Sequence, residues 1–67
     1  MILAQVIFLI HDINDIEVYL PQAPRKGETF VFPFIKGKIA MDFKIKDIEW
    51  VFDECNKFTK IRVYLEE

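Results

Sequence analysis

The sequence predicts an all-β fold, a small and partly open barrel of five or six strands. One observation is a long alternation of apolar and polar residues over 39–52, with a one-residue slip at Lys46-Asp47. Alternation at period two indicates a strand with one buried face, and the slip indicates a β-bulge, at which a strand bends so that a small sheet can curl. Turn-forming residues also separate several shorter alternating segments. Finally, 52% hydrophobic and 15% aromatic residues supply a core to a chain with one cysteine.

The first two predicted strands are expected to form a β-hairpin. Positions 2–10 are almost wholly apolar, so a strand here presents apolar side chains on both faces. Only one face of a small barrel lies inside, and we expect the other to meet a loop, a terminus or another subunit. Positions 11–15 are rich in turn formers, and positions 16–20 alternate as a half-buried strand.

Proline and glycine divide the middle of the chain. Positions 21–24 end the second strand, because proline supplies no N–H to a sheet. Gly27 suits a turn over 25–28, since glycine adopts positive φ freely. Positions 29–34 follow as a third strand, in which Pro33 indicates a sheet edge or a strand end.

The second half of the chain is predicted to be one long hairpin. A loop over 35–38, with glycine at its tip, leads into the bent strand over 39–52. A polar connection follows over 53–57, and alternation over 60–65 indicates the last strand.

One stretch, 47–57, also fits a helix that Asp47 would cap. Its apolar residues at helical spacing are Ile48, Val51, Phe52 and Cys55. However, most residue types here are weak helix formers, and several favour strands. We therefore favour a strand followed by a turn, with no unbroken helix across this stretch.

The alternation also predicts which side chains are buried, because residues two apart on a strand share a face. The predicted core consists of Ile7, Leu9, Val18, Leu20, Phe30, Phe32, Phe43, Ile45, Ile48, Trp50, Ile61 and Val63. The phenylalanines at 30, 32 and 34 form a stripe that suits either a barrel interior or a subunit interface.

Length and charge limit the classes of protein that fit. Residues 1–67 are expected to form a single β-barrel domain that buries roughly 60% of its unfolded surface. The net charge of −2 supplies no general attraction to nucleic acid or anionic lipid. Positions 1–10 are too short to cross a bilayer and lack the features of a signal peptide. With the lone thiol, this favours a cytoplasmic location.

The sequence contains no pattern typical of an active site or a bound cofactor. The turn at 12–15 resembles the start of a calcium loop, but Ile16 stands at the third ligand position and no glycine follows. His11 has no nucleophile marked for it, since the chain contains no serine. Cys55 follows two acidic residues, which disfavour the thiolate. We therefore expect no enzyme, no cofactor and no metal.

A candidate interaction surface combines basic residues with one aromatic ring. Its members are Arg25, Lys26, Phe34, Lys44 and Lys46. Cations for phosphate and ring faces for bases are what single-stranded nucleic acid requires of a protein. The simpler interpretation is that the lysines are the solvent side of strands, and nearby carboxylates dilute the positive field. Nucleic-acid binding is thus an alternative that the sequence does not favour.

Two segments carry a resemblance to known proteins, Pro24-Arg25-Lys26-Gly27-Glu28-Thr29-Phe30 and Phe43-Lys44-Ile45-Lys46-Asp47-Ile48-Glu49-Trp50. A P-R-x-G-E turn that opens a strand, followed by a bent alternating strand, resembles small bacterial β-barrel proteins of uncharacterised function. The resemblance covers roughly the central half of the chain. It implies an SH3-like barrel and brings no particular activity.

The sequence as a whole favours a small, non-catalytic interaction module. The reason is that positions 2–10 are apolar on both faces of the predicted strand. A homodimer joined through that strand or an adjacent edge would cover the face that the barrel leaves exposed. We expect a protein partner or a homo-oligomer, with no membrane and no small-molecule substrate. The alternative is weak binding of single-stranded nucleic acid by the basic and aromatic face.

Overall fold

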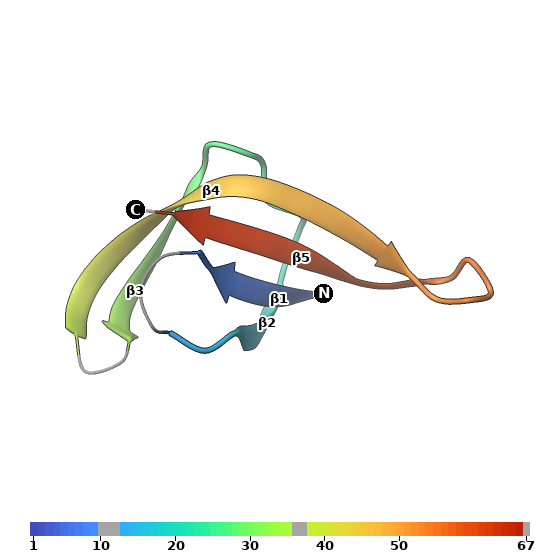
Figure 1. Cartoon of the computed structure of the whole chain (residues 1–67), viewed down its shortest axis with the longest axis horizontal. Helices are drawn as coiled ribbons and strands as arrows, with labels where there is room; N and C mark the ends of the chain where they lie inside the picture. Colours follow the sequence, from blue (N-terminus) through green and yellow to red (C-terminus); the bar gives the residue numbers. More distant parts are fainter. Residues whose placement is uncertain (10–12, 36–37, 67) are drawn as a thin grey trace.

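A computed structural model describes residues 1–9, 13–35 and 38–66, and for residues 33–35 and 38–40 it describes the backbone alone. These residues form five strands and no helix, which confirms the all-β prediction (Figure 1). The strands are β1 (Ile2–Phe8), β2 (Ile16–Leu20), β3 (Thr29–Ile35), β4 (Lys38–Phe52) and β5 (Phe58–Glu66).

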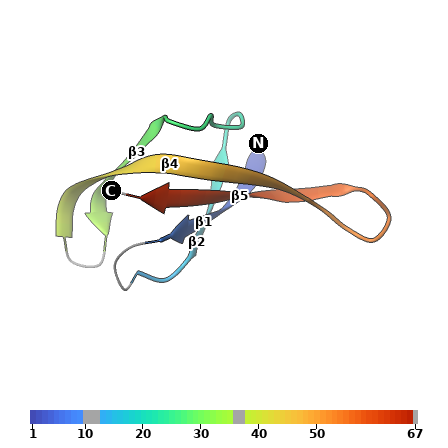
Figure 2. The same ribbon diagram turned by 45° about the horizontal axis from the view of Figure 1, so that its top comes forward.

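All five strands belong to one sheet in the order β2-β1-β5-β4-β3. Neighbouring strands are antiparallel, with the exception of β1 and β5, which run parallel. The predicted N-terminal hairpin is confirmed by the register that places Ile2 opposite Leu20, whereas the parallel pair was not predicted. The sheet curls into a half-barrel (Figures 1 and 2) whose two edges are β2 and β3.

The predicted bulge in β4 is confirmed. Leu65 and Tyr64 are adjacent on β5, yet they lie opposite Ile45 and Asp47, so Lys46 is an additional residue on β4. One additional residue lets apolar side chains on both sides of the slip face the same way. β4 accordingly arches over the sheet in Figure 1.

The stretch 47–57 forms the end of a strand and a turn, as favoured from its residue types. β4 continues to Phe52, and β5 begins at Phe58. The predicted turn over 25–28 is confirmed by positive φ at Gly27 (93°) and by the 3.1 Å hydrogen bond from the Glu28 N–H to the Arg25 carbonyl. Pro33 does lie on an edge strand, and the tip of the 35–38 loop lies outside the described residues.

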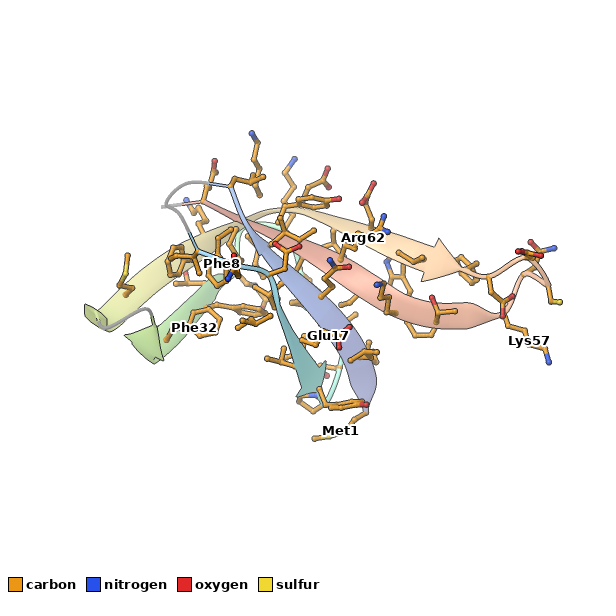
Figure 3. All side chains as sticks on the ribbon, turned by 60° about the horizontal axis from the view of Figure 1, so that its bottom comes forward. Met1, Phe8, Glu17, Phe32, Lys57 and Arg62 are labelled. Carbon is orange, nitrogen blue, oxygen red and sulfur yellow. The ribbon has the colours of Figure 1, made fainter. Side chains whose placement is uncertain are left out.

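The core lies on the concave face of the sheet. Its buried side chains are Ala4, Val6, Phe8, Phe43, Ile45, Ile61, Val63 and Leu65. The Phe8 ring makes edge-to-face contacts with Phe43, at a centroid distance of 5.0 Å, and with Phe32, at 5.6 Å. Figure 3 shows Phe8 and Phe32 together inside the curl of the sheet.

The prediction of the buried face of β1 was wrong. Ile7 and Leu9 were predicted inside, but Ala4, Val6 and Phe8 are the inward residues, and Leu9 is 47% exposed. Both faces of this strand are apolar, so alternation gave no basis for a choice. Pairing with β5 decides it, because the even-numbered residues lie opposite the core residues of that strand.

Other members of the predicted core differ in their burial. Phe43, Ile45, Ile61 and Val63 are buried as predicted. Half-buried residues packed against the core are Val18, Leu20, Phe30, Phe32 and Ile48. The prediction for Trp50 was wrong, since its side chain is 55% exposed, and Leu65 is a core residue that the prediction omitted.

Candidate functional site

Strands β4 and β5 extend beyond the other strands as a two-stranded hairpin, here called the β4–β5 ribbon (residues 47–60). β1 pairs with β5 only from Ile61 onward, and β3 pairs with β4 only as far as Lys44. The ribbon therefore has no third strand beside it within the described residues. It forms the long end of a molecule measuring 40 × 21 × 20 Å (Figures 1 and 2).

Three aromatic side chains, Trp50, Phe52 and Phe58, form an exposed cluster on this ribbon, here called the aromatic cluster. Their exposed fractions are 55%, 54% and 41%. The ring centroids of Trp50 and Phe58 lie 5.5 Å apart, and those of Phe52 and Phe58 lie 6.0 Å apart. Because Trp50 lies opposite the buried Ile61, its side chain is on the core face of the sheet. The cluster thus continues the apolar core face beyond the barrel.

The turn at the end of the ribbon holds the two strands together. The Asp53 Oδ1 atom accepts hydrogen bonds from the backbone N–H groups of Cys55 (2.8 Å) and Lys57 (3.0 Å). The Asp53 N–H in turn donates to the Lys57 carbonyl at 2.9 Å. Asn56 adopts positive φ (61°), a conformation that asparagine tolerates better than most residues. These bonds fix the register that brings Phe52 opposite Phe58.

The opposite face of the hairpin is polar at its base. The Tyr64 hydroxyl donates a hydrogen bond to Glu49 Oε1, and Arg62 Nη1 lies 3.7 Å from the same oxygen. The hydrogen bond to Glu49, with smaller contributions from desolvation and from the Glu49 charge, raises the pKa of Tyr64 above its ordinary value of 10.0. One face therefore carries an ionic group and the other carries bare rings.

The structure brings four of the five predicted surface residues together. The Gly27 N–H donates to the Ile45 carbonyl at 2.9 Å, and the Ile45 N–H donates to the Glu28 carbonyl at 2.8 Å. These bonds hold the turn with Arg25 and Lys26 against β4 at the residue between Lys44 and Lys46, and all four basic side chains are exposed. Carboxylates share this region, since Glu28 and Asp47 are also exposed.

Phe34 does not join these basic residues. Its backbone lies opposite Ile39, whereas Lys44 lies opposite Thr29 at the other end of β3. Five residues of strand separate the two positions, which is roughly 15 Å. The side chain of Phe34 lies outside the described ones. The backbone therefore places Phe34 away from the basic residues with which it was predicted to form one surface.

The outer face of β1 carries less exposed apolar surface than positions 2–10 suggested. Leu3 and Ile7 are half-buried there. Between them, Gln5 Nε2 donates to Asp15 Oδ2 at 3.1 Å, while Gln5 Oε1 is buried without a hydrogen-bond partner. Among the described side chains, the largest group of exposed rings lies on the ribbon instead.

The remaining candidates for chemistry are the acidic side chains, His11 and Cys55. Across residues 1–9, 13–35 and 38–66, no three His, Cys, Asp or Glu side chains are placed to hold a metal ion. His11 and Asp12 lie outside the described residues. Cys55 is an exposed residue of the ribbon turn.

Comparisons with protein-family models, with curated proteins and with solved structures found no match. The SH3-like resemblance therefore stays an expectation. The part of the chain that the structure describes has no helix of the length and apolar character needed to cross a membrane.

Strand length is a signal by which the aromatic cluster can be found. β4 has 15 residues, whereas β1 and β3 have seven each. β3 lies beside β4, and β1 lies on the far side of β5. Because β4 is about twice as long as either of them, it must extend beyond both, so some of its inward residues cannot be covered. Trp50, assigned to the core from alternation alone, lies in that uncovered part.

Proposed function

We propose that this chain is a small, non-catalytic interaction module that self-associates through the aromatic cluster. The observation that carries the proposal is a set of three adjoining rings, 41–55% exposed, on a ribbon with two strands. A two-stranded hairpin alone is marginally stable in water. Covering its apolar face would remove aromatic surface from water and would stabilise the ribbon at the same time.

A second copy of the chain is the partner that this surface fits best. A two-fold axis would bring the cluster of one copy against the cluster of the other, so the interface needs no separate complementary surface. Adjoining rings stack edge-to-face or offset, and such rings are frequent at the energetic centre of interfaces. This proposal keeps the expected self-association but moves it from strand 2–10 to the ribbon.

The exposed area predicts a weak dimer. A large aromatic side chain can bury about 150–250 Å², so three half-exposed rings offer roughly 300 Å² per copy. Two copies would bury roughly 600 Å² through the rings, below the 1,200–2,000 Å² that is typical of stable complexes. We therefore expect a weak dimer whose population rises with protein concentration.

Sedimentation equilibrium of the wild type and of a Trp50→Ser/Phe58→Ser double variant tests the proposal. The wild type should dimerise, and the variant should dimerise at least about thirtyfold more weakly, the effect of losing an interface hot spot. Tyr19→Ser is the matched control, because Tyr19 is 66% exposed and lies on β2, away from the ribbon. Trp50 is the only tryptophan, so its fluorescence should shift to the red as the dimer is diluted.

Two results would contradict self-association at this surface. One is a wild-type protein that stays monomeric at the highest concentration that can be reached. The other is a loss of dimerisation in Tyr19→Ser as large as in the double variant. Circular dichroism of each variant confirms that the fold is retained.

The basic residues on the other side favour a second candidate, weak binding of single-stranded nucleic acid. The hydrogen bonds between the 25–28 turn and Ile45 support it, because they gather Arg25, Lys26, Lys44 and Lys46. Fluorescence titration with short oligonucleotides at low and moderate salt tests it, and true phosphate contacts should weaken as salt rises. Binding that is absent below high micromolar concentrations, or that ignores salt, excludes this candidate.

A further inference from the structure

The two edge strands of the sheet face each other across an apolar groove, here called the β2–β3 seam. The groove has a volume of about 270 Å³ and is lined by Val18, Leu20, Thr29, Phe30, Val31 and Phe32. Among the described residues, no Cα atom of β2 lies within 8 Å of a Cα atom of β3. Paired strands lie about 4.8 Å apart, so two strands separated by one additional strand lie about 9.6 Å apart. The Cα separation of β2 and β3 therefore exceeds 8 Å, which is at least most of the roughly 9.6 Å that one additional strand between them requires.

No described residue pairs with the backbone of β3 on the side of the seam. The N–H and C=O of Ile45 both point to the β3 side of β4, where they bond the turn that precedes β3. Alternation along the antiparallel pair means that Phe30 and Phe32 also use their backbone groups toward β4. The N–H and C=O groups of Thr29 and Val31 therefore point away from β4, toward the seam.

The backbone of β2 likewise has no partner on the seam side within the part of the chain that the structure describes. The Leu9 N–H donates to the Leu65 carbonyl at 3.0 Å, so odd-numbered residues of β1 bond β5 and even-numbered residues bond β2. Their partners on β2 are Leu20, Val18 and Ile16. Glu17 and Tyr19 lie between these partners, so their backbone groups point away from β1. The N–H and C=O groups of these two residues therefore point to the seam, where no described strand pairs with them. The backbone of Pro33, like that of Thr29 and Val31, points away from β4. Because proline supplies no N–H, strand pairing on this edge is limited to the first half of β3.

We propose that the β2–β3 seam binds an extended segment of a partner protein as an additional strand, with apolar residues at alternate positions and basic residues between them. The proposal does not rest on self-association, because the seam and the aromatic cluster share no residue. β2 and β3 run in opposite directions, so the added strand is antiparallel to one edge and parallel to the other. The free backbone groups supply affinity, as in other cases of strand addition.

The side chains around the seam set the pattern of the segment. Inward positions of an added strand enter the groove between Val18 and Leu20 on one side and Phe30 and Phe32 on the other, which requires apolar residues. Outward positions lie next to Glu17, which is exposed and forms no ion pair within the described part of the chain (Figure 3).

Charge complementarity further restricts where the basic residues fall. Asp42 lies opposite Val31 on the outer face, but Lys44 lies opposite Thr29 and partly offsets it. The basic positions of the segment should therefore pair with Glu17 on the β2 side. The net charge of −2 agrees with a basic partner.

Amide hydrogen exchange, measured by NMR with and without a blocked peptide of alternating valine and lysine, tests the proposal. The Trp50→Ser/Phe58→Ser variant is used, so that a failure of the dimer proposal does not affect the result. With peptide in roughly tenfold excess over Kd, exchange at Glu17, Tyr19, Thr29 and Val31 should slow by about tenfold. A peptide of the same composition in scrambled order, which loses the alternation, should give no such protection.

Val31→Pro is the decisive variant. It removes a free N–H that β3 does not use toward β4, at the same phase as the natural Pro33, so the sheet should be retained while peptide binding falls at least tenfold. Val31→Thr keeps the N–H and is the matched control. If Val31→Pro does not fold, Glu17→Lys takes its place, because this exposed substitution removes the charge complementarity and should also weaken binding severalfold.

Four outcomes overturn the proposal. The first is no protection at millimolar peptide, and the second is protection on the ribbon instead of at the seam. The third is equal binding of a lysine-only peptide or of a single-stranded oligonucleotide, which would show that charge alone acts. The fourth is protection of the four amides that depends on protein concentration without peptide, which would assign the seam to a second copy of the chain.

Discussion

Two residues with left-handed backbone conformations, Gly27 and Asn56, position the gathered basic residues and the aromatic cluster. Gly27 has φ of 93°, and a β-carbon built there meets no atom within 4 Å, so a side chain would be opposed by the backbone conformation alone. Its turn carries two of the four gathered basic residues. Asn56 has φ of 61° and closes the ribbon that carries the aromatic cluster. Each surface thus depends on one residue that can adopt left-handed backbone geometry.

At the same scale, the pair of Tyr64 and Glu49 should make stability depend on pH in the alkaline range. The neutral hydroxyl donates to Glu49, and the raised pKa means that the folded state keeps this proton at a pH where the unfolded chain loses it. The stabilisation is complete below about pH 10, the ordinary pKa of tyrosine, and it is lost as pH rises through the raised pKa. Urea unfolding at a series of alkaline pH values should show the midpoint falling.

The control for this prediction is Tyr64→Phe, which lacks the titrating group. Its urea midpoint should fall less steeply over the same pH range. An identical fall in both proteins would show that other groups cause the alkaline loss of stability. Ultraviolet absorbance of the tyrosinate, compared between the two proteins, reports the direction of the Tyr64 pKa shift directly.

Among the elements, β4 decides most of the architecture. It pairs with β3 from Lys38 to Lys44 and with β5 from Lys44 to Phe52, and the bulge at Lys46 interrupts the pairing with β5. Before the bulge Phe43 and Ile45 face the core, and after it Ile48 does. Without the additional residue one of these groups would face solvent, since a slip of one residue moves side chains to the other face.

Deletion of Lys46 should therefore destabilise the protein far more than its substitution. Turning Ile48 out of its packing would cost about 1.5–3 kcal/mol of burial, and Trp50 would leave the core face with it. Lys46→Ala keeps the additional residue and should change the free energy of unfolding by less than about 0.5 kcal/mol, as for an exposed site. Urea unfolding of both variants checks the contrast, and equal stabilities would mean that the bulge does not set the register.

The whole molecule combines a small core with a large uncovered surface. A chain of 67 residues is expected to be stable by roughly 3–10 kcal/mol, and eight of the described apolar side chains are buried in the core. The aromatic cluster and the β2–β3 seam leave further apolar surface in water. A fold with so little margin gains from any partner that binds its folded form.

Phe43→Ala should remove most of that margin. Phe43 is fully buried and packs against Phe8 and Phe32, and truncating a core phenylalanine costs about 3–5 kcal/mol. Thermal unfolding followed by circular dichroism should show a large loss or no transition. Val31→Thr, at a residue that is 61% exposed, is the control and should change stability by less than about 0.5 kcal/mol. A Phe43→Ala protein as stable as the control would place the core elsewhere.

The fold was more predictable than the candidate site, and particular residues show why. Alternation and the slip at Lys46-Asp47 are local properties of the chain, so they predicted the strands and the bulge. The inward face of β1 was wrong because residues such as Ile7 and Phe8 are equally apolar, and only pairing with β5 distinguishes them. Of the predicted surface residues, Phe34 is separated from the basic residues by the register of β3 against β4.

The sequence by itself determined the all-β class, the turns at Gly27 and at 53–57, and the bend in β4, because each follows from residue type and spacing along the chain. The tertiary structure alone decided the parallel pairing of β1 with β5, the exposure of Trp50 and the open seam between β2 and β3. Those features depend on where neighbouring strands end, which is a relation between distant parts of the chain.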